Sequence, residues 1–147
     1  MKAQRIVQLM TIMICFTVSL WGCSGGSITI SIGSPTILSA SPSDGATNVG
    51  VNVTIGVIFS EAMDPSTITP TTLIIRSPDF IIAGRVSNSI SSDEEFPGST
   101  VATFTPLGAL RFSTSYTVTM TTDAKNLAGI PLETDHTWTF TTEPAPK

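Results

Sequence analysis

The sequence has few charged side chains for its 147 residues. Charged residues make up 12% of the chain, and the formal net charge is −4. No run of lysines or arginines appears anywhere, so the electrostatic footprint of a nucleic-acid-binding protein is missing. Low charge combined with many valine, isoleucine and threonine residues favours an all-β protein over a helical one.

Cysteine and histidine are almost absent from the part of the chain that is expected to fold. The two cysteines, Cys15 and Cys23, lie in or beside the first hydrophobic run, and His136 is the only histidine. A metal site built from sulfur and imidazole is therefore excluded in practice. If the chain is cut before Cys23, no disulfide remains, and the core alone must hold a domain of about a hundred residues, which is large enough.

The N-terminal hydrophobic run is too short to span a membrane. It covers Ile6 to Trp21, which is 16 residues, whereas a spanning helix needs about 20. Lys2 and Arg5 precede the run, and the small residue Gly22 follows it. A basic start, an apolar middle and a small residue before the cut are typical of a secretory signal peptide.

The end of this run, Leu20–Cys23, resembles the lipobox of bacterial lipoproteins, with Trp21 in place of the usual small residue. The resemblance implies a signal peptide over residues 1–22 and acylated Cys23 as the first residue of a membrane-anchored lipoprotein. Ser24 after the cysteine favours the outer membrane. Two or three acyl chains hold a protein firmly, since each buried methylene adds about 0.8 kcal/mol. The alternative is an uncleaved signal anchor with an incidental cysteine.

Residues 23–35 are rich in serine and glycine and form the predicted tether. Within them, Ser27–Ile32 alternates serine or threonine with isoleucine. Such a segment serves either as a flexible connection or as an extra edge strand, and we favour the flexible connection.

Alternation of apolar and polar residues predicts seven short strands. The clearest segment is Asn52–Phe59, in which Val53, Ile55, Val57 and Phe59 face one side. Turn signals separate the strands, and no amphipathic helix appears, which predicts an antiparallel β-sandwich with a small barrel as the main rival. The other predicted strands are Thr36–Ala40, Thr71–Arg76, Ile81–Ser87, Thr100–Thr105, Tyr116–Thr121 and His136–Thr142.

Aromatic residues of the last strands are expected on the core face. Trp138 and Phe140 alternate with threonines, so both rings face inward. Tyr116 begins a strand after a turn, where a buried ring with its hydroxyl bonded to nearby backbone can fix a corner. We interpret these residues as stabilising the fold rather than as performing chemistry.

The order of several motifs along the chain resembles the bacterial immunoglobulin-like domain of the SbsA type, named from a surface-layer protein. The resemblance implies an immunoglobulin-like antiparallel β-sandwich of about seven strands over residues 36–142, followed by a tail over residues 143–147. Such domains usually serve as spacers or interaction modules at the cell surface. The motifs are Ser41–Val49, Phe59–Asp64, Thr103–Pro106, Leu110 with Thr114–Val118, Ala128–Gly129 and Trp138–Thr142.

No catalytic residue is predicted. His136 stands beside Asp135, but the chain has no Gly-x-Ser-x-Gly elbow. Alternation also places His136 on the same face as Trp138, at the start of a strand and therefore at the rim. The expected protein is not an enzyme and needs no cofactor.

Oxygen ligands for calcium are conceivable at the ends of the sandwich, although the sequence contains no Asp-x-Asp-x-Asp loop. The competing interpretation makes Asp64 the cap of a helical turn that begins at Pro65, and the others turn residues. The candidate ligands are Glu61, Asp64, Asp123 and Asn126, with Asp44 as a further possibility.

The segment Asn88–Gly98 is polar and is predicted to be an exposed loop. It contains Asp93, Glu94 and Glu95, which form the only acidic cluster of the sequence, followed by the aromatic Phe96. Loops on a rigid sandwich commonly perform recognition, so this cluster is the predicted interaction loop. The expected function is a non-enzymatic, lipid-anchored envelope protein acting in structure, adhesion or protein interaction. The partner would be another envelope protein or a surface glycan, and the alternative is a carbohydrate-binding module.

Overall fold

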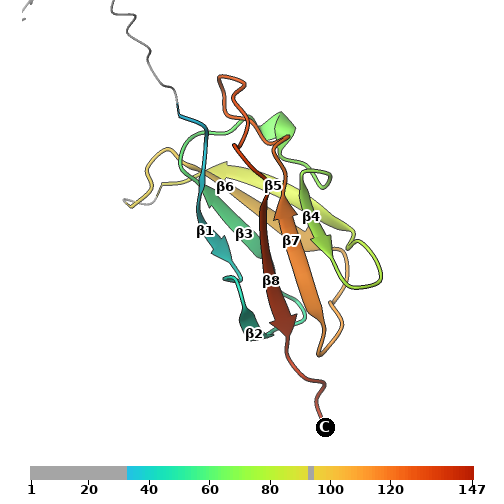
Figure 1. The fold of residues 1–147 in the computed structure, drawn as a ribbon. Coiled ribbons are helices and arrows are strands. Elements are labelled where there is room, and N and C mark those ends of the chain that lie inside the picture. The colour runs from blue at the N-terminus through green and yellow to red at the C-terminus, as the bar shows by residue number, and fades with distance from the viewer. Residues whose placement is uncertain (1–32, 93–94) are drawn as a thin grey trace, which may run out of the picture. The chain divides into compact units, whose positions relative to one another are not determined.

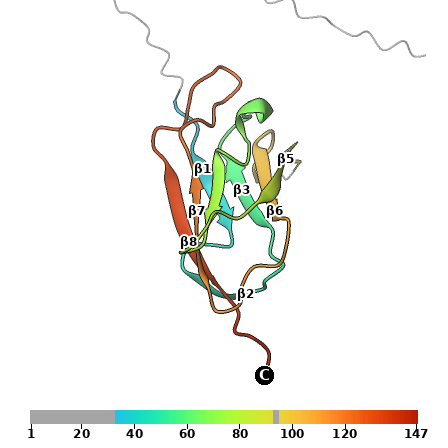
Figure 2. The ribbon, with the colours of Figure 1, turned by 90° about the vertical axis from the view of Figure 1, so that its right-hand side faces the viewer.

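The computed structural model describes residues 33–92 and 95–147, which form two four-stranded sheets packed face to face. The first sheet has the order β1-β3-β6-β5 and the second the order β2-β8-β7-β4 (Figure 1, Figure 2). Among the described residues, the one helical element is the 3₁₀ turn η1 (Pro65–Thr67). The strands are β1 (Ile37–Ser41), β2 (Ala46–Val49), β3 (Ile55–Phe59), β4 (Leu73–Arg76), β5 (Gly84–Ile90), β6 (Thr100–Pro106), β7 (Ser115–Met120) and β8 (His136–Thr142).

The predicted all-β sandwich is confirmed, with eight strands in place of about seven. The expectations for the signal peptide, for Cys23 and for the tether up to residue 32 lie outside the described residues, as do those for Asp93 and Glu94.

The strand that the sequence pattern did not predict is β2. It pairs in parallel with β8, with Ala46 opposite Phe140 and Val49 opposite Thr142. Gly45 just before it has a φ angle of 72°, and Asn48 within it has a φ angle of 56°. A four-residue strand with one residue in the left-handed region develops no regular alternation, which explains why it was missed.

The predicted boundaries of β5 are wrong by about three residues. Ile81 and Ile82 pair with the end of β4 instead, since the Ile82 N–H donates to the Ile75 carbonyl at 2.8 Å. The pairing of β5 with β6 then starts at Gly84 and continues to Ile90. Asn88–Ile90 are therefore strand residues, and the predicted loop is shorter at its beginning.

Two other strands, β3 and β4, begin two or more residues later than predicted, because turns occupy their first residues. The Val53 N–H donates to the Gly50 carbonyl (3.2 Å), so β3 starts at Ile55 rather than Asn52. The N–H groups of residues 72 and 73 both donate to the Thr69 carbonyl, which delays β4.

The core lies between the two sheets and follows the predicted alternation. Ile55, Val57 and Phe59 of β3 are fully buried. On β8, Trp138 is 2% exposed, which confirms its prediction as a core residue. The rings of Tyr116 and Phe140 stack with 5.5 Å between their centroids.

Candidate functional site

The described chain enters and leaves the sandwich at opposite ends (Figure 1). At one end, the Thr36 N–H donates to Ser60 Oγ and the Ser60 N–H donates to the Thr36 carbonyl, both at 2.9 Å. At the other end, the Glu143 N–H donates to the Val49 carbonyl at 2.8 Å. We call these ends the N-terminal pole, with connections 60–72, 91–99 and 121–135, and the C-terminal pole, with connections 50–54, 77–83 and 107–114.

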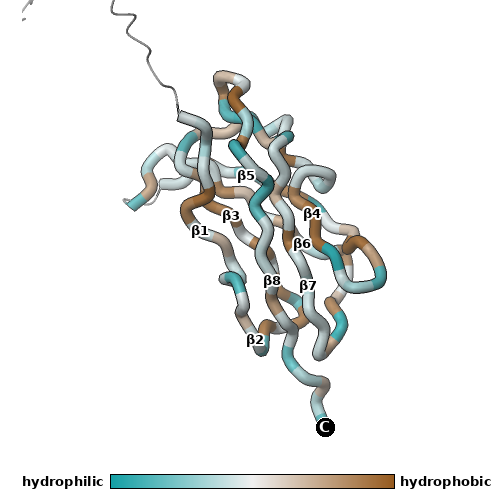
Figure 3. Tube along the Cα trace, viewed as in Figure 1, coloured by the Kyte–Doolittle hydropathy of each residue, from teal (hydrophilic) through white to brown (hydrophobic). Residues whose placement is uncertain are grey.

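Four of the seven exposed large apolar side chains in the described residues lie on two connections of the C-terminal pole, 77–83 and 107–114. Figure 3 shows part of the connection after β4 in the hydrophobic colour, next to white and teal stretches. Leu107, on the other connection, is 66% exposed. Exposed large apolar side chains that lie together on one face are typical of an interaction surface. The exposed set here is Phe80, Ile81, Leu107 and Phe112.

Arg111 links the two connections on the surface. Its guanidinium lies 4.8 Å from the centroid of the Phe80 ring, and its Nη1 lies 3.3 Å from Asp79 Oδ2. Both charged side chains are more than half exposed, so the ion pair stabilises the fold little. Its effect is to place one cation and one anion beside an exposed aromatic ring.

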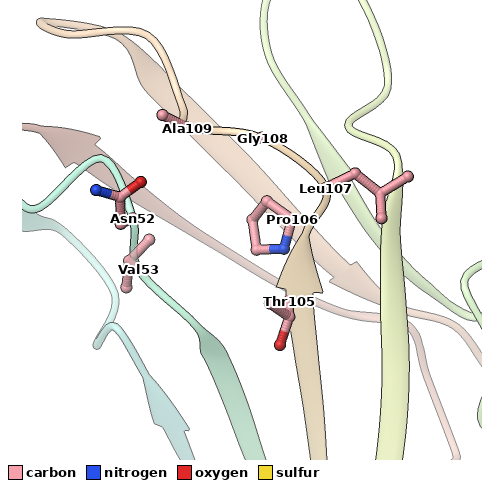
Figure 4. A pocket seen from close by; sticks show the side chains of 7 residues that line it. All are labelled: Asn52, Val53, Thr105, Pro106, Leu107, Gly108 and Ala109. Carbon is pink, nitrogen blue, oxygen red and sulfur yellow. The ribbon is translucent and has the colours of Figure 1, made fainter.

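Two hollows flank the segment 107–109 at this pole. The first hollow has a volume of about 260 Å³. Asn52 and Val53 line one side of it, and residues 105–109 line the other. Figure 4 shows the Leu107 side chain pointing to the side away from Asn52 and Val53. The second hollow, of about 270 Å³, lies on that other side and is lined in part by Phe80 and Ala83. Each is large enough to accept a side chain of a partner.

A buried tyrosine fixes the connection that carries Leu107 and Phe112. Tyr116 is fully buried, and its Oη accepts a hydrogen bond from the Arg111 N–H at 2.8 Å. The Thr142 hydroxyl donates to the Arg111 carbonyl at 2.6 Å. The predicted tyrosine corner is confirmed, and the exposed residues are therefore presented on a rigid support.

At the N-terminal pole, a buried asparagine organises the β7–β8 connection. Asn126 is 2% exposed, and its Oδ1 accepts hydrogen bonds from the N–H groups of Ala128 (3.0 Å) and Ile130 (2.9 Å). Its Nδ2 donates to Glu61 Oε2 at 3.1 Å. Gly129, in the same turn, has a φ angle of 80°, which a side chain would strain.

Three of the candidate calcium ligands, Glu61, Asp64 and Asn126, make side-chain hydrogen bonds within the described residues. Only Glu61 and Asn126 of the set are bonded to each other among the described residues. Asp64 caps η1, where its Oδ1 accepts from the Ser66 N–H (2.9 Å) and hydroxyl (2.7 Å). These two bonds hold the pKa of Asp64 below its ordinary value. Within the described ranges, no three His, Cys, Asp or Glu side chains form a group suited to a metal ion.

The structure places the other sequence candidates apart. Asp44 Oδ1 accepts from the Thr139 N–H (2.9 Å), beside the β2–β8 pair. Asp123 is exposed on the β7–β8 connection. Asp135 Oδ1 accepts from the Thr122 N–H (2.8 Å), and exposed His136 lies at the predicted rim.

The predicted interaction loop is only partly described. Glu95 is exposed and Phe96 is half-buried. The neck of the loop is closed by the Ser91 N–H, which donates to the Ser99 carbonyl at 2.7 Å. Its role in recognition stays a prediction. In the described part of the chain, no helix has the length and hydrophobicity to cross a membrane.

Residues 32–142 match the family described as bacterial Ig-like domain, and the chain belongs to that family. No match was found among curated proteins.

Solved structures share the fold at low identity. Domains 1–6 of the surface layer protein SbsC are 23% identical with a TM-score of 0.52; the match covers 80% of this chain and 15% of that one. CopC from Methylosinus trichosporium OB3b is 14% identical with a TM-score of 0.55, covering 77% of this chain and 97% of that one. LD transpeptidase LdtMt1 in complex with imipenem is 21% identical with a TM-score of 0.50, covering 74% and 40%.

The apolar surface of the C-terminal pole was missed by sequence reasoning. A usable signal existed, because Phe80 follows Pro78 and Asp79, and Leu107 stands between Pro106 and Gly108. Large apolar residues inside turn sequences have no strand face to occupy. They are therefore expected on the surface.

Proposed function

We propose that this chain is a non-enzymatic lipoprotein whose single Ig-like domain presents a protein-binding surface away from a bacterial membrane. Membership in the bacterial Ig-like family and the likeness to a surface-layer protein support an extracytoplasmic location. The lipobox-like ending at Cys23 supports a lipid anchor in the outer membrane. The proposed partner is another envelope protein.

The observation that carries this proposal is the polarity of the domain. The described chain enters at the N-terminal pole, where Thr36 bonds Ser60, and the exposed apolar set lies at the opposite pole. A seven-residue strand spans about 23 Å at about 3.3 Å per residue. The domain therefore holds Leu107 and Phe112 roughly that far from the pole where the described chain enters it.

A glycan partner is the second candidate, and one observation favours it. The rings of Phe80 and Phe112 are both partly exposed at the C-terminal pole. Exposed aromatic faces stack on apolar faces of sugar rings, and Arg111 supplies hydrogen-bond donors beside Phe80. The acidic residues Asp93, Glu94 and Glu95 remain a third proposed contact, and Glu95, the one described residue of the three, lies at the other pole.

The anchor is tested by fractionation and mass spectrometry. The mature protein should begin at Cys23 and carry acyl chains there. The Cys23→Ser variant should leave the membrane fraction once its signal peptide is cut. Unchanged membrane binding of the cleaved variant would overturn the lipoprotein part of the proposal.

The contact surface is tested by crosslinking the protein to its neighbours in intact cells. A Leu107→Ser, Phe112→Ser double variant should lose most crosslinked partner. The matched control is Leu127→Ser, since Leu127 is 72% exposed at the N-terminal pole. Equal losses in both variants, or none in either, would contradict recognition at the C-terminal pole. Loss only after replacing Asp93, Glu94 and Glu95 by serine would assign recognition to the acidic loop.

A further inference from the structure

β5 is an edge strand of the first sheet, and half of its backbone groups point away from that sheet. The Leu107 N–H donates to the Ala83 carbonyl at 3.0 Å, just before β5. The Ser91 N–H donates to the Ser99 carbonyl at 2.7 Å, just after it. Hydrogen-bonded and non-bonded positions alternate in an antiparallel pair. The backbone N–H and C=O groups of the odd-numbered residues of β5 therefore point toward β6. The residues whose N–H and C=O groups face outward are Gly84, Val86, Asn88 and Ile90.

This edge lacks most of the features that block further pairing. Protected edges have prolines, bulges, several charges or very short strands. β5 has no proline and one charged residue, Arg85, and its register with β6 is regular over seven residue pairs. Such an edge accepts an additional extended strand through main-chain hydrogen bonds.

The side chains of β5 define what that strand should contain. Gly84, Val86 and Asn88 are half-buried on the inner face, whereas Arg85, Ser87 and Ser89 are exposed on the outer face. One end of β5 adjoins the hollow of about 270 Å³ lined by Phe80 and Leu107. A smaller hollow of about 130 Å³ at the other end is lined by Pro65 and Ile90. A fitting strand is apolar on its inner face and polar on its outer face.

Ser27–Ile32 has this pattern. Isoleucine occupies positions 28, 30 and 32, and serine or threonine occupies positions 27, 29 and 31. Six extended residues span about 20 Å, close to the length of β5. We propose that this donor segment of a second copy of the chain adds to β5 as a fifth strand of the first sheet. The inference goes beyond the proposed function and does not depend on the lipid anchor.

The donor segment has to come from another copy, because within one chain it leads directly into β1, at the opposite edge of the first sheet from β5. Residues 33–36 connect the donor segment to β1, which is separated from β5 by β3 and β6. That separation is about 14 Å at about 4.8 Å per strand. Pro35 is buried and lines a hollow with Leu132 and His136, beside the second sheet. Only Gly33 and Ser34 stand between Pro35 and the donor segment, and these three steps span at most about 11 Å, which is less than the separation from β5.

The test measures binding of a labelled peptide with the sequence of residues 27–32 to the full chain purified in detergent. The acceptor is the Ile30→Pro variant, because proline prevents its own donor segment from pairing. Saturable binding is expected. In the proposed pairing the added strand is antiparallel to β5, with its isoleucines opposite Gly84, Val86 and Asn88, so the isoleucine N–H groups face β5. Methylation of the Ile30 nitrogen should therefore weaken binding at least tenfold. Methylation of the Thr29 nitrogen, which faces away, should change it little.

Sedimentation of the intact protein supplies the second arm. The wild-type chain should form dimers or larger assemblies, and the Ile30→Pro variant should be monomeric. Absent peptide binding, or equal binding of the two methylated peptides, would overturn the proposal. Assemblies that persist in Ile30→Pro but disappear in Val86→Pro would also overturn it, since β5 would then pair with β5 of another copy.

Discussion

The two poles of the sandwich are built from different kinds of residue, although each is fixed by one buried polar side chain. Asn126 bonds two backbone N–H groups and Glu61 at the N-terminal pole. Tyr116 bonds one backbone N–H group at the C-terminal pole. The first pole has the acidic loop, and the second has the exposed apolar set of Phe80, Ile81, Leu107 and Phe112.

The difference shows that, at the C-terminal pole, the residues that hold a connection rigid are not the residues that it exposes to solvent. Tyr116 orders residues 111–114 without covering Phe112 or Leu107, so the exposed side chains cost the domain little to display. At the other pole the buried network of Asn126 serves the loop itself. Substitutions should therefore separate stability from recognition at the C-terminal pole more cleanly than at the N-terminal pole.

The largest expected effect comes from the core that both poles share. Trp138→Ala should lower the free energy of unfolding by about 3–5 kcal/mol, because it leaves a cavity between the sheets. Denaturant unfolding measures this loss. Thr137→Ala, at an exposed neighbouring position on β8, is the control and should change little. A small effect of Trp138→Ala would contradict its assignment to the core.

At the N-terminal pole, Asn126→Ala should cost about 1–3 kcal/mol, because buried donors lose their acceptor. Unfolding of the purified variant gives the value. Asn52→Ala serves as the control, since Asn52 is exposed. Equal stability of the two variants would mean that the Asn126 network does not hold the β7–β8 connection.

At the C-terminal pole, Tyr116→Phe should cost about 1 kcal/mol, since one hydrogen bond is lost while the ring remains. Amide hydrogen exchange locates the effect. The Arg111 amide should exchange faster in the variant, and the Ala128 amide should not. Faster exchange at both amides would show that the poles are coupled rather than independent.

The smallest expected effect is a pH dependence at η1. The pKa of Asp64 is lowered by hydrogen bonds from Ser66, so this contribution to stability is present above the unfolded pKa and is lost as pH falls through the folded pKa. Asp64→Asn retains a capping side chain that does not titrate. Below about pH 4, melting temperature should fall more in the wild type than in Asp64→Asn. Parallel curves of melting temperature against pH for the two proteins would contradict a stabilising role of the Asp64 carboxylate.

Strands with strong alternation could be predicted from the sequence, and short or irregular ones could not. Val57 and Phe59 marked β3, and Trp138 and Phe140 marked β8, because one face of each is buried. β2 was missed because it has only four residues and Asn48 within it lies in the left-handed region, which interrupts any alternation. The boundaries of β5 depended on a local pairing of Ile82 with Ile75 that alternation does not reveal.

The candidate site was less predictable than the core. Tyr116 was identified as a corner because its role is local, with its partner Arg111 five residues away. The apolar surface, in contrast, exists because two connections meet, and Asp79 lies 32 residues from Arg111 in the chain. A sequence pattern does not show which loops of a sandwich share an end.

The parallel pairing of β2 with β8 has a mechanical consequence. Gly45 donates to Thr139 and Glu143 donates to Val49, each at 2.8 Å, so bonds lie at both ends of the pair. A pulling force between the two poles draws β2 toward the N-terminal pole and β8 toward the C-terminal pole. The load then acts along the strands, and these bonds must yield together in shear rather than open one at a time. The domain is thereby suited to bear tension between whatever is attached at its two ends.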